Sequence, residues 1–311
     1  EMCIRDSLQL GYALTFHYIC TKLSNRCANQ PDVLAKNDPF GTPVYSCPIS
    51  KKQYLLFTKL LHMEKSDSIV IIPTYNEKEN IESIIRAVLA LEEHAFHILI
   101  IDDGSPDGTA AIVKRLMADE FKNEVHLIER KGKLGLGTAY IAGFKWAIEQ
   151  GYDYVFEMDA DFSHDPKDLP RLYNACAKEG YDVAIGSRYV SGVNVVNWPM
   201  GRVLMSYYAS KYVRMVTGVP IHDTTAGFKC YRRRVLETIN LDAIHFKGYA
   251  FQIEMKFTAY KLGFKVKEVP VIFVNRQLGT SKMSGGIFSE ALFGVMRLRW
   301  YALTGKIKPR C

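Results

Sequence analysis

The chain has 311 residues and 48% of them are apolar, which is enough for one large domain or two small ones. A mean hydropathy of −0.07 excludes a protein made mostly of membrane-spanning helices. The net charge of +7 suits a phosphate-bearing ligand or an anionic membrane surface, and no basic run is interleaved with aromatic residues, so we expect no nucleic-acid partner. The seven cysteines include no CxxC pair and indicate neither a zinc site nor a disulfide framework, so a reducing compartment is the default.

Residues 1–65 differ from the rest of the chain. Leu8–Cys20 is apolar but too short to span a bilayer, and Asn29–Pro48 holds four prolines without a helical or strand period. Met63 directly precedes the first strong strand and is a possible start. We predict an extension outside the fold, either disordered or not natural coding sequence; a membrane-binding N-terminal segment is the alternative.

From residue 66 onwards, apolar strands alternate with helices. Ser68–Ile72 is a strand that Pro73 breaks, and Asn76 is the expected N-cap of the helix that follows. The next elements are predicted in this order: a strand at His97–Ile101, a helix at Ala110–Met117, a strand at Val125–Ile128, a glycine-rich loop at Lys131–Gly137, a helix at Thr138–Gln150 and a strand at Tyr154–Met158. This alternation predicts a parallel sheet with right-handed crossovers.

The second half continues the pattern less regularly. Its predicted elements are a helix at Leu169–Gly180, a strand at Asp182–Ile185, a polar loop at Ser191–Pro199, a helix at Arg202–Val216, an irregular and then extended stretch at His222–Tyr231, a helix starting at Arg232–Arg234, a helix at Tyr249–Leu262 and a strand at Lys265–Val274. The fold class is therefore α/β, with a mixed but mostly parallel sheet flanked by helices.

The last segment, Gly286–Leu303, is amphipathic with Trp300 near its end, and a basic tail follows it. This composition predicts an interfacial helix that lies on a membrane surface. Arg202–Val216, which is rich in tyrosine, is a candidate for a second membrane-facing element. The alternative for both helices is packing onto the domain core. No run of about 20 apolar residues is present, so no spanning helix is expected.

Asp159-Ala160-Asp161 ends the buried strand Tyr154–Met158. Two carboxylates one residue apart repel each other unless a cation lies between them, and Mg²⁺ or Mn²⁺ prefers such oxygen ligands and shares its shell with phosphates. A solvated acidic turn that caps the next helix is the alternative.

Two other strand ends carry groups that suit a nucleotide. Tyr75 offers a flat ring for a base, Glu77 an acceptor for base or ribose donors, and Asp103 an acceptor for ribose hydroxyls. A helix cap and a simple turn are the alternatives. Because parallel strands end at the same edge of a sheet, we expect these groups and Asp159–Asp161 to lie together. The glycine-rich loop at Gly132–Gly137 matches neither a P-loop nor a first-strand GxGxxG, which disfavours a dinucleotide-binding protein, and a flexible helix entry is its simpler interpretation.

These residues carry a family resemblance. The chain resembles the dolichol- and polyprenol-phosphate mannose synthases, which are inverting glycosyltransferases of family 2 with the GT-A fold, in the motifs PTYNE, IIDDGSPDGT, KLGLGTAY, MDADFSHDP, GSRYVSG, AGFKCYRR, GYAFQIEM and FVNRQLGTSKMS. The match runs in order from Ser68 to Met283, so we expect a GT-A domain at 66–283 and the interfacial helix with its tail at 284–311. The resemblance implies a GDP-mannose donor, Mg²⁺ or Mn²⁺, a polyprenyl (dolichyl) phosphate acceptor and a β-D-mannosyl phosphate product.

The resemblance also implies roles for single residues. Donor-binding residues would be Pro73, Tyr75, Glu77, Ile101, Asp103, Asp159, Ala160, Asp161, Arg276 and Lys282. Asp159 and Asp161 would bind the metal, with Ser163 at the variable third metal position. Arg188 and Arg202 would meet the acceptor phosphate and would, with the two aspartates, be the catalytic residues.

The chemistry that the family implies needs no general base, because a phosphate monoester is largely ionised at neutral pH. Glu254 lies near where relatives with hydroxyl acceptors keep a catalytic acid, and here we expect it to have a structural or orienting role. The lipid acceptor implies a peripheral protein on the cytoplasmic face of a membrane, or one with a separate anchoring subunit.

Three other functions remain open. The first is the same fold using UDP-glucose or another nucleotide sugar. The second is a non-catalytic nucleotide-sugar-binding subunit, which the intact acidic and basic motifs disfavour. The third is a nucleotidyltransferase, which the lack of a glycine-rich loop after the first strand disfavours.

Overall fold

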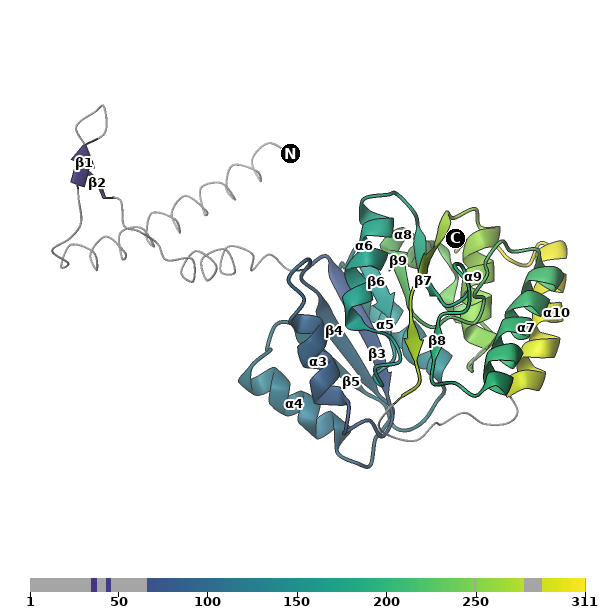
Figure 1. The fold of residues 1–311 in the computed structure, drawn as a ribbon, viewed down its shortest axis with the longest axis horizontal. Coiled ribbons are helices and arrows are strands. Elements are labelled where there is room, and N and C mark those ends of the chain that lie inside the picture. Colours follow the sequence, from purple (N-terminus) through teal and green to yellow (C-terminus); the bar gives the residue numbers. More distant parts are fainter. Residues whose placement is uncertain (1–34, 38–42, 46–65, 249, 277–286, 311) are drawn as a thin grey trace. The chain divides into compact units, whose positions relative to one another are not determined.

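The computed structural model describes residues 35–37, 43–45, 66–248, 250–276 and 287–310 (Figure 1). The chain divides into two compact units, residues 1–64 and 65–311. In the first unit the described residues form an antiparallel pair, β1 (Ala35–Asn37) and β2 (Pro43–Tyr45), which the sequence pattern did not predict. That residues 1–65 are an extension outside the catalytic fold stays a prediction.

The second unit is built on a seven-stranded sheet (Figure 1). Its strands are β3 (Ser68–Thr74), β4 (His97–Asp102), β5 (Val125–Glu129), β6 (Tyr154–Glu157), β7 (Val183–Ser187), β9 (Lys229–Arg232) and β10 (Val266–Pro270). They lie in the order β10-β7-β9-β6-β3-β4-β5, and β9 is antiparallel to its neighbours while the other pairs are parallel. The predicted mixed, mostly parallel sheet is confirmed.

Eight α-helices are described around this sheet. They are α3 (Ile81–Leu89), α4 (Thr109–Asp119), α5 (Leu136–Glu149), α6 (Leu169–Ala177), α7 (Met200–Thr217), α8 (Arg233–Thr238), α9 (Ala250–Lys261) and α10 (Ile287–Leu303), with the short 3₁₀ turns η1 (Pro166–Asp168) and η2 (Leu241–Ala243). Each predicted helix is present, and the boundaries differ by a few residues, as helix ends commonly do.

The alternation of side chains along the strands produces two apolar cores, one on each face of the sheet. On β3, Ile69 and Ile71 pack with residues of α5, α7, α8, α9 and α10, whereas Val70 and Ile72 pack with residues of α3, α4 and α6. All four of these side chains are fully buried. The sequence pattern of continuous apolar strands is therefore explained by helices covering both faces.

The sheet opens at its carboxyl edge between β3 and β6. The two strands pair only from Ser68 to Ile71, while β3 continues beside β4 to Thr74. The chain connections diverge at this point: β3 is followed by β4 on one side of the opening, while β6 lies on the other side. Open α/β sheets bind ligands at such a point. The prediction that Pro73 ends the strand is wrong. Alternate residues of β3 face β6, and Pro73, which has no N–H, faces the side from which β6 has already departed.

The prediction that Asn76 caps a helix is also wrong. Asn76 has a left-handed backbone (φ 55°), and α3 begins only at Ile81 after a turn closed by a hydrogen bond from the Asn80 N–H to the Glu77 carbonyl. The N–H groups of Asn76 and Glu77 donate instead to the hydroxyls of Ser105 and Thr109. This turn places Glu77 at the open edge, and only 8% of the residue is exposed to solvent.

The strand predicted at Lys265–Val274 is two strands in the structure. β10 pairs with β7 as far as Ser187, where β7 ends and offers no further partner. The chain then crosses to the predicted polar loop and pairs as β11 (Phe273–Val274) with the short strand β8 (Val195–Val196). The crossing segment carries the chain over the carboxyl edge of the sheet.

The predicted C-terminal helix is present as α10, which packs beside α7 and α9 (Figure 1). Val295 and Leu298 are buried, and Gly294 lies so close to Phe246 that a Cβ there would come within 2.6 Å of the ring. Phe293 and Met296 of the same helix are exposed.

Candidate active site

The carboxyl edge of the sheet brings the predicted acidic residues together. Tyr75–Glu77, Asp102–Asp103 and Asp159–Asp161 follow the parallel strands β3, β4 and β6. Arg276, from the segment after β11, joins two of these strand ends: its Nη2 lies 2.6 Å from Asp161 Oδ2 and its Nη1 lies 3.9 Å from Glu77 Oε1. The predicted convergence of the strand ends is therefore present.

Asp159 and Asp161 repel each other inside this edge. Burial raises the pKa of Asp159 to about 7, with the negative charge of Asp161 adding to the shift and Arg276 opposing it. The Ser163 N–H donates to Asp161 Oδ1 over 3.0 Å and fixes that carboxylate. A positive charge placed between the two carboxylates would relieve this repulsion and favour the ionised form of Asp159.

This donor set fits a hard divalent cation. Asp159 and Asp161 offer carboxylate oxygens, and in the described part of the chain no cluster of three or more His, Cys, Asp or Glu side chains exists that would enclose a metal by itself. Mg²⁺ and Mn²⁺ are bound in this way, by one or two carboxylates with water and substrate phosphates completing the shell. Ser163 is buried and its amide orients Asp161; its role as a third ligand stays a prediction.

Behind the aspartates lies a buried charged group that the sequence analysis missed. Lys229 Nζ donates to Glu157 Oε2 over 2.9 Å and also to Gln252 Oε1, while Gln252 Nε2 donates to Glu157 Oε2 over 2.7 Å. Glu157 and Lys229 are fully buried cross-strand partners on β6 and β9. A glutamate that ends the apolar strand β6 and a lysine that begins β9 are the signal that would have found this pair.

A second missed residue is Arg130, at the end of β5. Its Nε donates to Asp103 Oδ1 over 2.6 Å, and the Leu134 N–H donates to Asp103 Oδ2 over 3.3 Å. The glycine-rich loop is thereby held against Asp103. Near it, the Lys133 ammonium lies 5.4 Å from the centre of the Tyr75 ring.

The same loop is tied to the rest of the fold through two glycines. The Gly137 N–H donates to the Lys247 carbonyl over 2.8 Å, and at Gly135 (φ +104°) a Cβ would come within 3.1 Å of that carbonyl. The interpretation of this loop as a merely flexible helix entry is wrong, because its backbone is anchored at both Asp103 and Lys247.

Glu254 has the orienting position that we expected. From α9 its carboxylate accepts the N–H groups of His245 and Phe246 over 2.9 and 3.0 Å. Since Lys247 follows directly and holds Gly137, the acid fixes the turn against which the glycine-rich loop rests. Glu254 is 3% exposed, and nothing in this geometry presents it to a substrate.

Three predicted donor-binding residues lie at the edge with little side-chain exposure. Ile101 is fully buried, Ala160 is 4% exposed, and Pro73 is partly buried opposite Ile101 in the β3–β4 register. Their predicted contact with a donor stays a prediction, and their burial leaves mainly backbone atoms at the edge.

Arg188, at the end of β7, lies in a buried ion pair. Its Nε and Nη2 donate to the two carboxylate oxygens of Asp223 over 2.7 Å each, and Nη2 also donates to Thr225 Oγ1 over 2.8 Å. The residue is 3% exposed and is surrounded by the rings of Tyr189, Trp198 and Phe273. Its predicted contact with an acceptor phosphate stays a prediction, and the structure adds a strong internal partner.

Arg202, in the first turn of α7, lies nearer to the open edge. Its guanidinium stacks over the Trp198 ring at 3.9 Å, and its Nη1 donates to Asn275 Oδ1 over 3.2 Å. Asn275 is the neighbour of Arg276, so the structure brings a predicted acceptor residue beside a predicted donor residue. Lys282, the remaining predicted site residue, lies outside the described residues.

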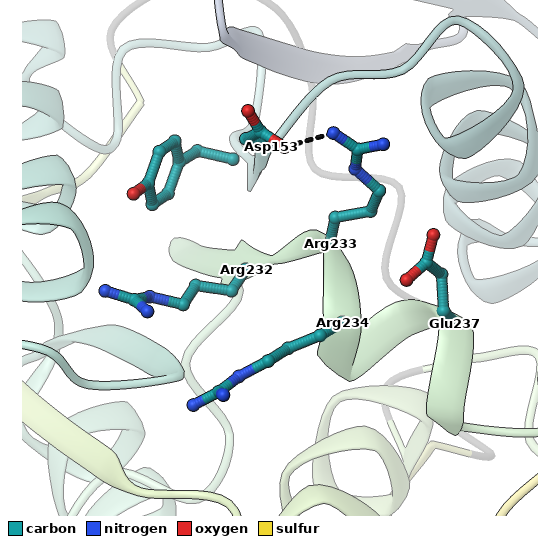
Figure 2. A pocket seen from close by; sticks show the side chains of 6 residues that line it. Asp153, Arg232, Arg233, Arg234 and Glu237 are labelled. Atoms are coloured by element: carbon teal, nitrogen blue, oxygen red, sulfur yellow. Dashed lines mark hydrogen bonds and ion pairs between the residues drawn. The ribbon is translucent and has the colours of Figure 1, made fainter. Parts of the chain in front are cut away.

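Two pockets lie at opposite edges of the sheet. One, of about 290 Å³, adjoins Asp161 and is lined also by Asn80, Phe162 and Asn275. The other, of about 300 Å³, lies where β6 begins and β9 ends and is lined by Arg232, Arg233, Arg234, Asp153, Tyr154 and Glu237 (Figure 2).

The arginines of the second pocket do not converge. Figure 2 shows Arg233 turned towards Asp153, while Arg232 and Arg234 extend in other directions. Arg232 donates to the Cys176 carbonyl, and Arg234 Nε donates to Asp182 Oδ1 over 2.7 Å. Each guanidinium thus joins neighbouring segments of the fold, so the pocket beside Asp161 is the better candidate for chemistry.

The fold and this edge define a GT-A glycosyltransferase. The chain belongs to glycosyl transferase family 2, whose model matches residues 69–239. A solved structure of glucosyl-3-phosphoglycerate synthase from Mycobacterium tuberculosis, in complex with Mn²⁺ and UDP-glucose, matches with a TM-score of 0.53 at 20% identity, over 75% of this chain and 78% of that one. At this identity the likeness concerns the fold alone.

Two curated relatives are much closer in sequence. Polyprenol monophosphomannose synthase of Mycolicibacterium smegmatis is 51% identical over 232 residues, which cover 73% of this chain and 85% of the relative. Undecaprenyl-phosphate mannosyltransferase of Micrococcus luteus is 46% identical over 244 residues, which cover 77% of this chain and 98% of the relative. The resemblance recognised from the motifs is confirmed.

Proposed function

We propose that this chain transfers mannose from GDP-mannose to a polyprenyl phosphate and yields a polyprenyl β-D-mannosyl phosphate. The observation that carries the proposal is the identity of 51% and 46% to two enzymes named for mannosyl transfer to polyprenol carriers, over most of their length. The acids and arginines at the carboxyl edge support it, because they supply the groups that such a transfer needs.

In the proposed reaction an oxygen of the acceptor phosphate attacks C1 of mannose from the face opposite the diphosphate. The bond from that oxygen to C1 forms while the bond from C1 to the β-phosphate oxygen breaks, and GDP leaves with the electron pair. The attacking phosphate is already ionised, so no proton has to move and no general base is required. This agrees with an orienting rather than a catalytic position for Glu254.

The chain's own residues position the donor. We assign Tyr75, Glu77 and Asp103 to the nucleoside, with Arg130 and the Leu134 N–H fixing Asp103. Asp159 and Asp161 would hold Mg²⁺ or Mn²⁺, which when bound neutralises the charge that develops on the departing diphosphate. Arg276 adds a fixed cation at the same place, and oriented charge of this kind is worth roughly 10²–10³ in rate for one donor.

The acceptor phosphate is assigned to Arg202, which stands beside Asn275 and Arg276 at the open edge. A guanidinium suits this task because it binds phosphate through two parallel hydrogen bonds. Arg188 remains a candidate for the same phosphate, although contact would require part of its pairing with Asp223 to be exchanged.

The reaction is tested with purified protein, polyprenyl phosphate in detergent or vesicles, Mg²⁺ or Mn²⁺, and radiolabelled GDP-mannose or UDP-glucose in parallel. We expect label from GDP-mannose in a lipid product that mild acid releases as mannose. Transfer from UDP-glucose alone would replace the donor, and binding of both nucleotides without any transfer would support the non-catalytic alternative.

The second part of the proposal concerns the membrane surface. Among the described residues no helix has the length and apolar character to cross a bilayer. Helices α7 and α10 nevertheless pack side by side (Figure 1). Large apolar side chains of both helices are exposed. These side chains, here called the α7–α10 apolar face, are Met200, Leu204, Met205, Tyr207, Tyr208, Met215, Phe293, Met296, Trp300 and Leu303.

The exposure of this face is large. Met215, Phe293 and Leu303 are 77%, 70% and 68% exposed, whereas the buried residues of α7 are Ser210, Val213 and Thr217. The buried side of α7 is made of small side chains, with Val213 between Ser210 and Thr217, whereas its larger apolar side chains are exposed, unlike those of an ordinary surface helix.

Basic residues accompany the α7–α10 apolar face. Exposed cations on the two helices and the tail are Lys211, Arg297, Lys306, Lys308 and Arg310. Apolar side chains with flanking cations are the composition of an interfacial membrane contact, and the polyprenyl tail of the proposed acceptor resides in a bilayer. We therefore assign this face to an anionic lipid surface; that the protein reaches it from the cytoplasmic side stays a prediction.

Sedimentation with vesicles tests this assignment. We expect wild-type protein to bind vesicles with phosphatidylglycerol more tightly than neutral ones, with a blue shift of tryptophan fluorescence. A variant with Phe293→Ser, Met296→Ser and Leu303→Ser should lose binding and keep turnover of acceptor dissolved in detergent. Vesicle binding equal to wild type contradicts a lipid contact, and binding that requires a second protein assigns the face to an anchoring subunit.

A further inference from the structure

The segment between β10 and Arg276 is fixed to the carboxyl edge by its backbone. The N–H groups of Val271, Phe273, Val274 and Asn275 donate to four different carbonyls of the β7–β8 region and of the loop after Asp161, over 3.0–3.1 Å. The Val274 N–H reaches the Ser163 carbonyl, within the same loop as the metal-binding acids. Arg276 is thus delivered to its position by an ordered backbone.

At that position Arg276 is paired with a residue that the proposed metal also needs. Its Nη2 is 2.6 Å from Asp161 Oδ2, and its Nη1 is 3.9 Å from Glu77 Oε1. The Asp161 side chain is 5% exposed and that of Arg276 is 26% exposed, so the guanidinium lies on the open side of the acid. Among the described residues, Lys229 is the other cation near these acids, and it is committed to Glu157 on the buried side.

We propose that Arg276 is a built-in competitor of the divalent cation for Asp161, and that a nucleoside diphosphate removes this competition. A metal that binds alone has to approach Asp161 against the positive charge of the guanidinium. A diphosphate offers the guanidinium a better partner, because two phosphate oxygens accept its parallel N–H groups. Metal and diphosphate then bind cooperatively, beyond their direct attraction.

The inference rests on the proposed function only in assigning a divalent cation to Asp159 and Asp161. The inference predicts a gain in metal affinity: removing Arg276 should tighten binding of the metal alone while weakening binding of the diphosphate. A residue that served only to hold the diphosphate would leave the affinity for the metal alone unchanged. Since energetic couplings between sites are commonly 5- to 150-fold, we expect a gain of about tenfold.

The test measures Mn²⁺ binding to the full chain by the electron paramagnetic resonance signal of free Mn²⁺, with and without GDP. Arg276→Gln should bind Mn²⁺ about tenfold more tightly than wild type without GDP, and GDP should increase its Mn²⁺ affinity by a smaller factor than in wild type. Arg276→Lys, which keeps the charge but loses the planar fork, should fall between the two.

Lys133→Gln is the matched control. It also removes one positive charge near the same edge, but Lys133 lies over Tyr75 and no contact with Asp161 is found for it. Its affinity for Mn²⁺ alone should equal that of wild type. An equal gain for Lys133→Gln and Arg276→Gln would show a general charge effect and overturn the inference.

Two failures are distinguishable. Equal Mn²⁺ affinity of wild type and Arg276→Gln without GDP would overturn the competition and leave the proposed transfer reaction intact. If no variant bound Mn²⁺ even with GDP, the assignment of a metal to Asp159 and Asp161 would itself be wrong, and the inference would fall with it. Thermal unfolding of each variant checks that the fold is retained.

Discussion

The arginines at the two edges of the sheet differ in how their partners are arranged. At the carboxyl edge Arg276 contacts carboxylates from two different strand ends and remains partly open to solvent. At the other edge Arg232, Arg233 and Arg234 are consecutive, yet each binds its own neighbour in the fold. The run of three arginines thus links neighbouring segments of the fold, whereas the single Arg276 lies at the candidate site.

The two groups of arginines differ in whether their guanidinium groups can act on a ligand. Charges that converge on a crevice strengthen one another's effect on a ligand, because the field is concentrated there. Guanidinium groups that diverge and already donate to internal carbonyls and carboxylates contribute to stability instead. Substitutions at both edges and the pH dependence of stability test this difference.

Arg188 shows that an arginine at the carboxyl edge can also bind an internal partner and stabilise the fold. Replacing Arg188 with Gln would leave Asp223, which is fully buried, without its bidentate partner. Breaking a buried ion pair from one side costs about 3–5 kcal/mol, so we expect a loss of this size in the free energy of unfolding measured with urea. A variant that kept wild-type stability but lost affinity for the acceptor would instead place Arg188 among the ligand-binding arginines.

Asp161→Asn removes the negative charge that Arg276 and the proposed metal share. We expect the rate of mannosyl transfer to fall by about 10²–10³-fold, since an oriented charge next to the leaving group is lost. The free energy of unfolding should change little, because the variant also relieves the repulsion between Asp161 and Asp159. Transfer at the wild-type rate would exclude the metal role of this residue.

Arg234→Gln is the counterpart at the other edge. Asp182 is 3% exposed, and this change leaves its carboxylate with the Lys265 N–H as its remaining described partner. We expect a loss of about 1–3 kcal/mol in the free energy of unfolding, seen as a lower melting temperature. The rate of transfer at a temperature where both proteins are folded should be unchanged, and a slower rate would show that the second pocket takes part in catalysis.

The pH dependence of stability gives the smallest effect. Burial alone would raise the pKa of Asp223, but the charge and hydrogen bonds of Arg188 outweigh it and the pKa lies below its usual value of 3.8. The folded protein therefore binds this proton less readily than the unfolded chain does. The contribution of the pair is fully present above the unfolded pKa and is lost as the pH falls through the lower folded pKa.

Urea unfolding between about pH 5 and pH 2 measures this effect. The stability of wild type should fall with decreasing pH more steeply than that of Asp223→Asn, which has no carboxylate to protonate. Parallel profiles for the two proteins would mean that Arg188 does not hold the Asp223 carboxylate in its ionised form.

The sequence pattern predicted some parts of the chain more accurately than others. The strands at Ser68–Thr74 and His97–Asp102 were predictable because both faces are covered and each strand is a continuous apolar run. Asn76 was misjudged because Ser105 and Thr109 capture the backbone N–H groups that a helix would have used. The helix propensity of the local sequence carries no information about hydrogen-bond partners from a distant turn.

For the helix at Arg202–Val216, which is α7 in the structure, the sequence left open whether its exposed residues face a membrane or its apolar residues face the domain core. A helical period states which residues share a face; whether that face meets the core or the outside depends on what packs against it. In this fold Ser210, Val213 and Thr217 face inward and Met215 faces outward. The membrane assignment therefore follows from the packing of α7 and α10 and not from their composition alone.

The sequence pattern was sufficient for the helices, for most strands of the seven-stranded sheet and for the meeting of three acidic strand ends at one edge, because these follow from residue periodicity and from the alternation of strands and helices. The tertiary structure alone decided the charge partners. Arg276 meets Asp161, Arg188 meets Asp223 and Lys229 meets Glu157 across 115, 35 and 72 residues. An ion pair needs side chains a few ångströms apart, and only the folded sheet sets that distance.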